Sequence, residues 1–371
     1  MTIADHPAVE DGNRVVTYGA FNGQVDAHAA NLQTAKIAPG DLVAVMLPSS
    51  AEHLVILCAL ARTGGVVFSL APSLRAGEFR MAIAGLGVTA VIASARRAPV
   101  SGLKNFTVEE ICRPAPQPCA APTVDDDDPY LLIQSLGTTG EPKSFFRSHG
   151  DAKECIRRYA QNYQLTANDR TMSLVAMPFN VGRNVCLGTL RVGATIVVHR
   201  VSPIGDLVAT MAGRRVTFLL VAPVQARQLL SGSDNEAPLF PGLRIMTVGS
   251  APFTRHERGL ARRRLSPNLH EQPGTNETGD LTIATPADQD AYPDAVGRLI
   301  EGIEAQIVDT NHRPLPPGEV GIARFRGPDF TTGYLDNPDA TAWAFRDGWY
   351  YSGDRAALND EGYLFLQGPG R

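Results

Sequence analysis

The first half of the chain alternates short apolar runs with longer segments of helical length. The apolar runs are rich in β-branched residues, which is typical of buried strands. They lie at residues 41–47, 65–69, 88–93 and 130–133, and helical segments such as 50–63 and 76–86 separate several of them. Strands that alternate with helices in this way predict a parallel sheet covered by helices.

The same pattern returns after residue 171 and changes near residue 293. Strands are predicted at 172–176, 194–198, 217–221 and 244–248. Beyond 293 the pattern becomes short alternating strands with turns, as at 305–309 and 320–325. We therefore expect an α/β protein. It has two β-α subdomains with mostly parallel sheets at about 1–170 and 171–292, and a small β-rich subdomain, a distorted barrel, at 293–371.

Two stretches predict surface structure. Residues 113–122 are rich in proline and alanine and continue neither a helix nor a central strand, so we interpret them as a connector. The four aspartates at 125–128 repel one another and cannot all converge on one ion, which favours a solvated loop over a metal site.

Charge and cysteine usage exclude several function classes. The net charge of -4 gives no global positive field for nucleic acid, and we interpret the arginines between 255 and 264 as a solvated helix face. The five cysteines form no C-x-x-C pair, so neither a zinc site nor a disulfide framework is indicated; they are Cys58, Cys112, Cys119, Cys155 and Cys186. No apolar stretch reaches about 18 residues and no leader is evident, so we expect no membrane span and a cytoplasmic location.

The strongest chemical signal is the segment 130–143, Tyr-Leu-Leu-Ile-Gln-Ser-Leu-Gly-Thr-Thr-Gly-Glu-Pro-Lys. Its glycines let backbone N–H groups approach an anion, Thr138 and Thr139 add hydroxyl donors, and Lys143 adds a positive charge, which together suit a polyphosphate. Pro142 stands where a P-loop of the G-x-x-x-x-G-K-S/T kind needs glycine, so a simple P-loop NTPase is disfavoured. Taken alone, the segment is also compatible with a polar turn after a buried strand.

This segment resembles the signature loop of the adenylate-forming superfamily, S/T-S-G-T-T-G-x-P-K-G. That superfamily includes acyl- and aryl-CoA synthetases, luciferases and the adenylation domains of peptide synthetases. The matching residues are Ser135, Gly137, Thr138, Thr139, Gly140, Pro142 and Lys143. Leu136 and Ser144 depart from the pattern.

Other motifs of the superfamily follow in its order. Residues 247–252, Thr-Val-Gly-Ser-Ala-Pro, resemble the turn beside the adenine and acyl pockets, and 274–277, Gly-Thr-Asn-Glu, fall where the family has Y-G-x-T-E. Residues 318–334 resemble its G-E…G…G-Y stretch, and 351–354, Tyr-Ser-Gly-Asp, its Y-x-T/S-G-D. A chance loop would not be followed by these motifs in this order, so the resemblance covers nearly the whole chain.

The resemblance implies an acyl-CoA synthetase-like, AMP-binding N-terminal domain over residues 1–371. It implies that ATP and Mg²⁺ are used to activate a small carboxylic acid, which then passes to CoA or to the phosphopantetheine of a carrier protein. Catalysis is assigned to Thr138, Lys143 and Glu277, of which Thr138 and Glu277 would hold Mg²⁺, and Asp354 would hold the ribose. The nucleotide-binding set is Ser135, Gly137, Thr138, Thr139, Gly140, Lys143, Gly249, Ser250, Ala251, Pro252, Gly274, Thr275, Asn276, Asp354 and Arg371.

Some residues depart from the family pattern. Pro273 replaces the aromatic residue that stacks on adenine, and Asn276 replaces a hydroxyl residue. The stretch from Met177 to Gly182 resembles P-L/F-x-H-x-x-G without its histidine. We therefore predict a polar substrate pocket, formed by Phe179, Asn180, Val181, Arg183 and Asn184.

The last residues, 362–371, resemble the approach to the hinge of the superfamily, so we expect the C-terminal lid domain, which supplies a further lysine, to be absent and turnover to be low. Two alternatives remain: an adenylating relative with an unconventional acceptor, and a non-catalytic nucleotide-binding homologue. Three other motifs fail. The glycines of 85–90 follow a helix instead of a strand, 270–274 lack the second histidine of H-E-x-x-H, and no G-x-S-x-G is present.

Overall fold

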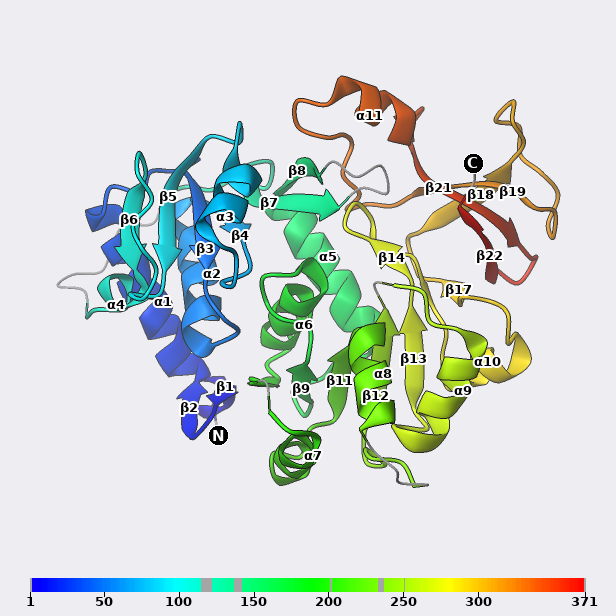
Figure 1. The fold of residues 1–371 in the computed structure, drawn as a ribbon, viewed down its shortest axis with the longest axis horizontal. Coiled ribbons are helices and arrows are strands. Elements are labelled where there is room, and N and C mark those ends of the chain that lie inside the picture. Colours follow the sequence, from blue (N-terminus) through cyan, green and yellow to red (C-terminus); the bar gives the residue numbers. More distant parts are fainter. Residues whose placement is uncertain are drawn as a thin grey trace.

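The computed structural model describes residues 2–114, 122–136, 142–200, 202–232, 237–249 and 251–369. Two α/β layers lie side by side, and a smaller antiparallel unit lies beside the second of them (Figure 1). The predicted fold class is therefore confirmed.

The first layer is a six-stranded sheet in the order β6-β5-β3-β4-β7-β8, parallel except for the β7–β8 pair. Alternate side chains of β3 enter opposite faces: Val43 and Val45 pack with α1 and α2, and Ala44 and Met46 pack with α3. The strands are β3 (Leu42–Met46), β4 (Val66–Ser69), β5 (Val88–Ala93), β6 (Lys104–Thr107), β7 (Pro129–Leu136) and β8 (Pro142–Ser148). The helices are α1 (Tyr18–Thr34), α2 (Ala51–Thr63), α3 (Ala76–Ile83) and α4 (Val108–Ile111).

The second layer is a seven-stranded sheet in the order β13-β12-β11-β9-β10-β1-β2. Its edge is the N-terminal hairpin β1–β2, which pairs with β10, so the start of the chain joins the sheet of the second region. Helices α5 and α6 pack on one face of this sheet, and α7, α8 and α9 pack on the other. The strands are β1 (Pro7–Asp11), β2 (Arg14–Thr17), β9 (Arg170–Ser173), β10 (Thr195–Val197), β11 (Phe218–Val221), β12 (Ile245–Gly249) and β13 (Leu269–Gln272). The helices are α5 (His149–Asn162), α6 (Asn180–Arg191), α7 (Ile204–Gly213), α8 (Pro223–Ser231) and α9 (Arg255–Arg264).

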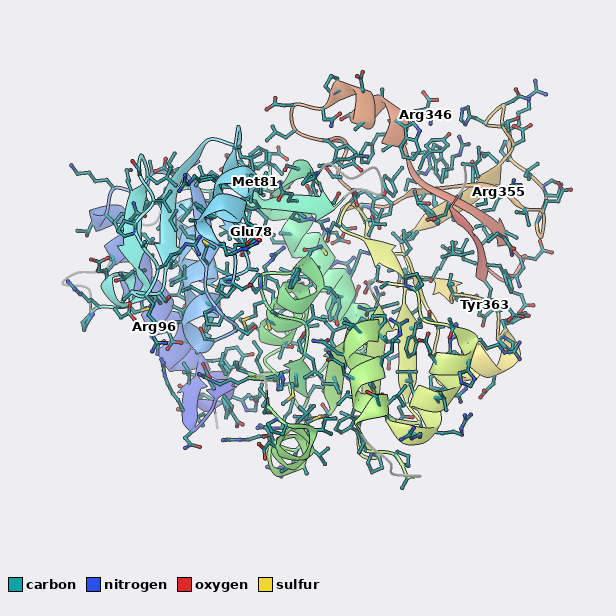
Figure 2. The ribbon with its side chains drawn as sticks, viewed as in Figure 1. Glu78, Met81, Arg96, Arg346, Arg355 and Tyr363 are labelled. Carbon is teal, nitrogen blue, oxygen red and sulfur yellow. The ribbon has the colours of Figure 1, made fainter. Side chains whose placement is uncertain are left out.

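The C-terminal unit is an antiparallel sheet in the order β18-β19-β21-β20, with β22 added to β21. Arg346 and Arg355 extend from it (Figure 2). Its strands are β18 (Glu304–Val308), β19 (Gly321–Arg326), β20 (Phe345–Arg346), β21 (Trp349–Leu358) and β22 (Leu364–Pro369). Two short pairs precede it, β14 (Gly274–Thr275) with β15 (Gly279–Asp280) and β16 (Thr282–Ile283) with β17 (Arg298–Leu299). The remaining helices are α10 (Pro286–Ala291), α11 (Pro338–Ala344) and a 3-10 turn at Ile3–Asp5.

One continuous apolar core joins the first two layers. It contains Leu54 and Leu57 of α2 together with Ala152 of α5, Cys186 of α6 and Ile196 of β10. Because these residues come from both layers, α5 and α6 are held firmly at the centre of the molecule (Figure 1).

The arginine-rich helix α9 corrects one expectation. We expected its arginines to be solvated, but Arg258 is only 7% exposed and forms an ion pair with Glu271 of β13, with 2.7 Å between Nη2 and Oε2. The helix turns Arg258 and Ala261 toward the sheet together, because residues three apart share a face. A carboxylate on the neighbouring strand makes this burial possible.

In the part of the chain that the structure describes, no helix is both long and apolar enough to cross a bilayer.

Candidate functional site

The predicted phosphate loop connects β7 to β8. These strands pair antiparallel with Ser135 opposite Lys143, so both residues lie at the base of the loop. The loop residues Gly137, Thr138, Thr139 and Gly140 lie outside the described residues, as do the predicted nucleotide contacts Ser250 and Arg371.

The Glu277 carboxylate lies directly beside this hairpin. Its Oε1 accepts a hydrogen bond from Ser135 Oγ at 3.0 Å and another from the Tyr334 hydroxyl at 2.9 Å. Glu277 is only 5% exposed. No described residue donates a hydrogen bond to Oε2, so two hydroxyl groups orient the carboxylate and leave its second oxygen for another partner.

Two tyrosines connect this carboxylate to the C-terminal unit. Burial and the charge of Glu277 raise the pKa of Tyr334, and burial followed by the same charge raises the pKa of Tyr350, so both hydroxyls stay protonated at neutral pH. Tyr350 also hydrogen-bonds Thr275, and the charge of Asp354 acts on it. Residues from three separate motifs therefore meet around Tyr334 and Tyr350.

Aromatic rings surround the Lys143 ammonium group. Its Nζ lies 5.1 Å from the ring centre of Tyr334 and 5.8 Å from that of Trp343 in α11. Both distances fall within the range of cation–π attraction. Tyr334 therefore contacts Lys143 through its ring and Glu277 through its hydroxyl.

Asp354 lies half-buried in β21. Burial raises the pKa of its carboxyl group, while the Ser352 hydroxyl opposes that shift. The preceding Gly353 has a φ of +82°, and a Cβ there would lie 3.0 Å from the Trp343 ring. A glycine is thus required both by the backbone and by the tryptophan that packs on it.

The predicted adenine-side turns lie at the ends of β12 and β13. Gly249 ends β12 opposite Gln272. Gly274 begins β14 and passes so close to the next strand that a Cβ would lie 2.2 Å from the Gly279 carbonyl oxygen, which excludes any side chain. Ala251 and Pro252 are exposed, and Arg227 donates to the Pro252 carbonyl at 3.0 Å.

The predicted substrate-pocket residues occupy the first turn of α6. Arg183 and Asn184 are 3% and 8% exposed, whereas Phe179 is 58% exposed. Arg183 Nη2 donates to Asn180 Oδ1 at 2.8 Å, and Asn184 Nδ2 donates to Cys155 Sγ at 3.3 Å. Val181 packs with the aromatic core under α5. The buried members of the set are therefore polar and face α5.

A buried charge cluster lies between α5 and the C-terminal unit. Arg158 forms an ion pair with Asp329, and Arg147 Nη1 lies 3.8 Å from the second Asp329 oxygen. Arg147 Nη2 donates to the Asn276 carbonyl at 3.1 Å, which ties the cluster to the turn that carries Glu277. Burial raises the pKa of the nearby Asp280 carboxyl to about 7.

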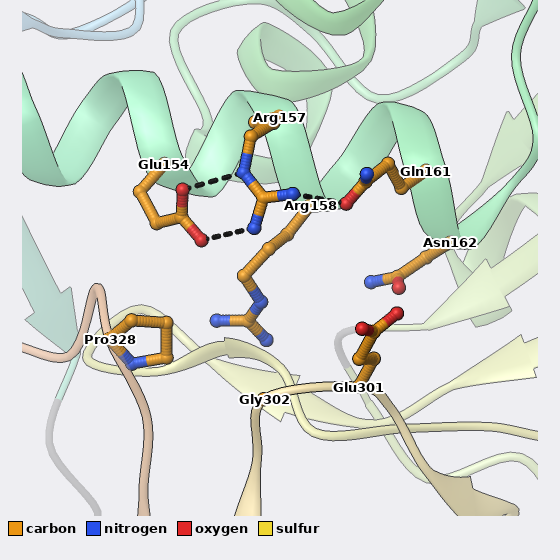
Figure 3. A pocket seen from close by; sticks show the side chains of 8 residues that line it. All are labelled: Glu154, Arg157, Arg158, Gln161, Asn162, Glu301, Gly302 and Pro328. Carbon is orange, nitrogen blue, oxygen red and sulfur yellow. Dashed lines mark hydrogen bonds and ion pairs between the residues drawn. The ribbon is translucent and has the colours of Figure 1, made fainter.

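A pocket of about 210 Å³ opens next to Arg158 (Figure 3). One side comes from α5, where Arg157 is paired with Glu154 and Gln161, and the other side includes Glu301 and Pro328. Arg158 projects across it. Both arginines of this pocket are already paired, Arg157 with Glu154 and Arg158 with Asp329 outside the pocket.

Sequence reasoning did not identify four residues of this region: Arg147, Tyr334, Trp343 and Tyr350. Tyr334 belonged to a matched motif, so its position was available, but its contact with Glu277 depends on tertiary structure. No pattern in the sequence singles out Arg147 or Trp343.

The chain is similar to enzymes that are named for activating carboxylic acids. Feruloyl-CoA synthase from Amycolatopsis sp is 28% identical over 374 residues, covering 97% of this chain and 74% of that protein. Salicyl-AMP ligase / salicyl-S-ArCP synthetase from Mycobacterium tuberculosis is 28% identical over 385 residues, covering 96% of this chain and 68% of that protein.

Among solved structures, ATP-bound MatB from Rhodopseudomonas palustris superposes with a TM-score of 0.90 at 22% identity, covering all of this chain and 77% of that one. This likeness confirms the fold. The model of the AMP-binding enzyme family matches residues 2–335, which is most of the sequence. The chain belongs to the AMP-binding enzyme family.

Proposed function

We propose that this protein activates a small carboxylic acid with ATP, forming an acyl adenylate and releasing pyrophosphate, and that the acyl group then passes to a thiol. A carboxylate oxygen attacks the α-phosphorus as the bond from that phosphorus to the pyrophosphate oxygen breaks. The observation that supports this most strongly is the meeting of three motif regions at Glu277, through Ser135, Tyr334 and Tyr350.

Glu277 fits a magnesium ligand. Mg²⁺ in nucleotide sites is commonly held by one or two carboxylates together with phosphate oxygens, and it keeps the rest of its shell as water. One oxygen of Glu277 is fixed by two hydroxyl donors, and the other has no donor among the described residues. A bound Mg²⁺ would neutralise phosphate charge, while Ser135 and Tyr334 hold the carboxylate in place.

We assign the other contacts by the same reasoning. Lys143 supplies a positive charge at the base of the phosphate loop, and Thr138 and Thr139 supply hydroxyls within it. The half-buried Asp354 accepts hydrogen bonds from the ribose hydroxyls. We place the base beside the turns at Gly249 and Gly274, where close backbone contacts exclude side chains. Positioning and charge neutralisation then promote attack without a covalent enzyme intermediate.

The names of the relatives support an aromatic acid and two kinds of acceptor. One relative is a feruloyl-CoA synthase and the other a salicyl-AMP ligase that also forms salicyl-S-ArCP. We therefore propose an aryl carboxylic acid as substrate and, as acceptor, CoA or the thiol of a carrier protein. The predicted cytoplasmic location stays a prediction.

The test is exchange of labelled pyrophosphate into ATP with a panel of aryl, fatty and amino acids. Exchange that depends on one acid and on Mg²⁺ is the expected result. Calorimetry with a non-hydrolysable acyl-AMP mimic adds a binding readout. Saturable binding without any exchange would favour a non-catalytic homologue, and the absence of both would overturn the proposal.

A matched pair of variants locates the activity. Glu277→Gln removes the charge that we assign to Mg²⁺ but keeps the shape of the side chain. Glu304→Gln makes the same change on the exposed surface of the C-terminal unit, where Glu304 pairs with Arg326. Only the first variant should strongly reduce pyrophosphate exchange, by about 10²–10³-fold. Equal effects of both would show that Glu277 has no special role.

A further inference from the structure

The guanidinium group of Arg183 is buried without an anionic partner. It is 3% exposed, and within the described residues it donates one hydrogen bond, to the neutral amide of Asn180. Among the described residues, no carboxylate lies within ion-pair distance of it and no group accepts a hydrogen bond from its Nε. A buried charge in this state is costly, so it implies a partner that arrives with a ligand.

The described groups whose charges act on Arg183 include no anion that could replace such a partner. The groups whose charges act on it are Tyr130, Arg147 and Cys155, and burial keeps the tyrosine and the thiol protonated by raising their pKa values. Burial also lowers the pKa of His53 to about 4, so this neighbour is neutral. The Arg183 pKa falls to about 10, which still leaves the guanidinium charged at neutral pH.

The same region holds further polar atoms that form no hydrogen bond with the described residues. They are Arg147 Nη1, His53 Nε2, His149 Nε2 and the Tyr159 hydroxyl, all buried. Native proteins leave few buried polar groups unsatisfied, and a group of them in one place commonly marks a ligand site. In addition, Phe179 caps α6 without a side-chain oxygen, so the first-turn N–H groups near Arg183 add partial positive charge.

The charges of the neighbouring residues also indicate that Arg183 lacks an anionic partner. Arg147, Arg158 and Arg183 bring three positive charges, whereas Asp329 pairs with Arg158 and lies at 3.8 Å from Arg147. Asp280, whose pKa of about 7 leaves it partly protonated, lies near Arg158, and Glu277 lies next to the Asn276 carbonyl that Arg147 contacts. None of these carboxyl groups forms an ion pair with Arg183, so its charge is the one left without a described counter-ion.

We propose that Arg183, with Arg147 beside it, binds a second carboxylate of the acid that the enzyme activates, so that its substrates are dicarboxylic acids. Through the Asn276 carbonyl, Arg147 contacts the turn that carries Glu277 in the proposed adenylation centre, and its charge reaches Arg183. One carboxylate would react at the nucleotide while the other binds the arginines.

This inference rests on the proposed function, and its test uses acids that differ by one carboxylate. Pyrophosphate exchange is measured with benzoate against phthalate, isophthalate and terephthalate, and with butyrate against succinate. Salicylate provides an uncharged hydroxyl in place of the second carboxylate. The best diacid should exceed its monoacid partner by about 10- to 100-fold in kcat/KM, as expected for a charge-assisted hydrogen bond in a buried site.

The variant Arg183→Met replaces the charge with an apolar side chain of similar length. It should reduce the diacid-to-monoacid ratio to near unity, and Arg183→Lys should restore part of it. The control Arg191→Met makes the same change on the exposed end of the same helix and should leave the ratio as in the wild type.

Thermal denaturation separates a ligand role from a structural one. Removing a buried charge that has no partner should leave the Tm of the ligand-free protein unchanged or higher. A diacid should raise the Tm of the wild type but not that of Arg183→Met. A large fall in Tm for Arg183→Met would instead identify Arg183 as structural and overturn the inference.

The two proposals fail in distinguishable ways. If monoacids or salicylate support exchange as well as any diacid, the dicarboxylate inference is wrong while the adenylation proposal stands. If no acid supports exchange and no acyl-AMP mimic binds, the adenylation proposal itself is wrong. If Arg183→Met still preferred diacids, the second carboxylate would not bind at this arginine, and the inference would be refuted.

Discussion

Two polar regions flank the proposed reaction centre, and they differ in how completely their groups are paired. Around Glu277, two hydroxyls bind one carboxylate oxygen and aromatic rings surround the lysine. Around Arg183, buried nitrogen atoms form no hydrogen bond with the described residues, and no described carboxylate pairs with its guanidinium group. The first region is organised by the protein alone, whereas the second lacks an anion.

The difference follows from what each region has to do. A site that stabilises a reaction works best when its groups are held in place beforehand by their neighbours. A site that selects a substrate gains selectivity when its buried polar groups are left unpaired by the wrong ligand. We therefore regard the nucleotide side as preorganised and the acyl side as completed by its substrate.

The largest effect is expected from Asp329→Ala, which removes the anion shared by Arg147 and Arg158. Breaking a buried ion pair by deleting one partner costs about 3–5 kcal/mol. We expect the free energy of unfolding in urea to fall by about that amount. Asp294→Ala breaks the exposed Arg255–Asp294 pair and should cost at most about 1 kcal/mol. If the free energy of unfolding fell equally in both variants, the buried ion pairs of Asp329 would contribute no more to stability than an exposed pair.

Glu277→Gln comes next and tests the nucleotide side. Removing one preorganised electrostatic group from a reaction centre lowers kcat by about 10²–10³-fold. We expect that loss in pyrophosphate exchange, with an unchanged urea midpoint because the amide keeps the shape and still accepts hydrogen bonds from Ser135 and Tyr334. Exchange within a factor of about two of the wild type would remove Glu277 from the proposed centre.

Asp354→Asn should have a smaller effect, and it should change the KM for ATP instead of kcat. The carboxylate is proposed to hold the ribose in both the ground state and the transition state, so its loss should raise the KM for ATP and leave kcat nearly unchanged. Hydrogen bonds to a charged group are worth about 1.5–3 kcal/mol, which predicts a rise of roughly tenfold or more. Asp360→Asn, at an exposed turn in the same unit, is the control.

The sequence predicted the layers well where apolar patterns were clear. The run at 88–93 matches β5, and the run at 41–47 contains β3, because buried parallel strands are continuously apolar. The strands of the two hairpins, β7–β8 and β1–β2, were harder to predict from the sequence. Strand β8 begins with a proline and contains Lys143 and Arg147, and β1–β2 is an edge pair, so neither has the pattern of a central strand.

The sequence proposed candidate residues for the site but not their pairing. Motif order pointed to Glu277 and Asp354, and their roles stay predictions. The contact between Tyr334 and Glu277 depends on how the C-terminal unit packs, which no local pattern encodes. For the same reason, the sequence suggested that Arg183 lies in a polar pocket but could not show that it is buried without a carboxylate.

The smallest effect is expected at Trp343, which tests how far the preorganisation of the nucleotide side extends. Trp343 is 53% exposed, packs on Gly353 and lies 5.8 Å from Lys143 Nζ. A cation–π contact at an exposed position is worth about 0.5–1 kcal/mol, so Trp343→Leu should raise the KM for ATP about two- to fivefold. Phe146→Leu, an exposed aromatic of β8, should leave it unchanged.

Fluorescence gives a direct readout of the same contact, since the chain has only two tryptophans. In Trp349→Phe the emission comes from Trp343 alone, and ATP should change it because the phosphates draw Lys143 away from the indole. Suppose that ATP does not change the Trp343 fluorescence and that Trp343→Leu does not change the KM for ATP. These two results would restrict the preorganised region to Ser135, Glu277 and Tyr334. A nucleotide-dependent signal would extend the preorganised region to α11, in contrast to the acyl side, where Arg183 pairs with no described carboxylate.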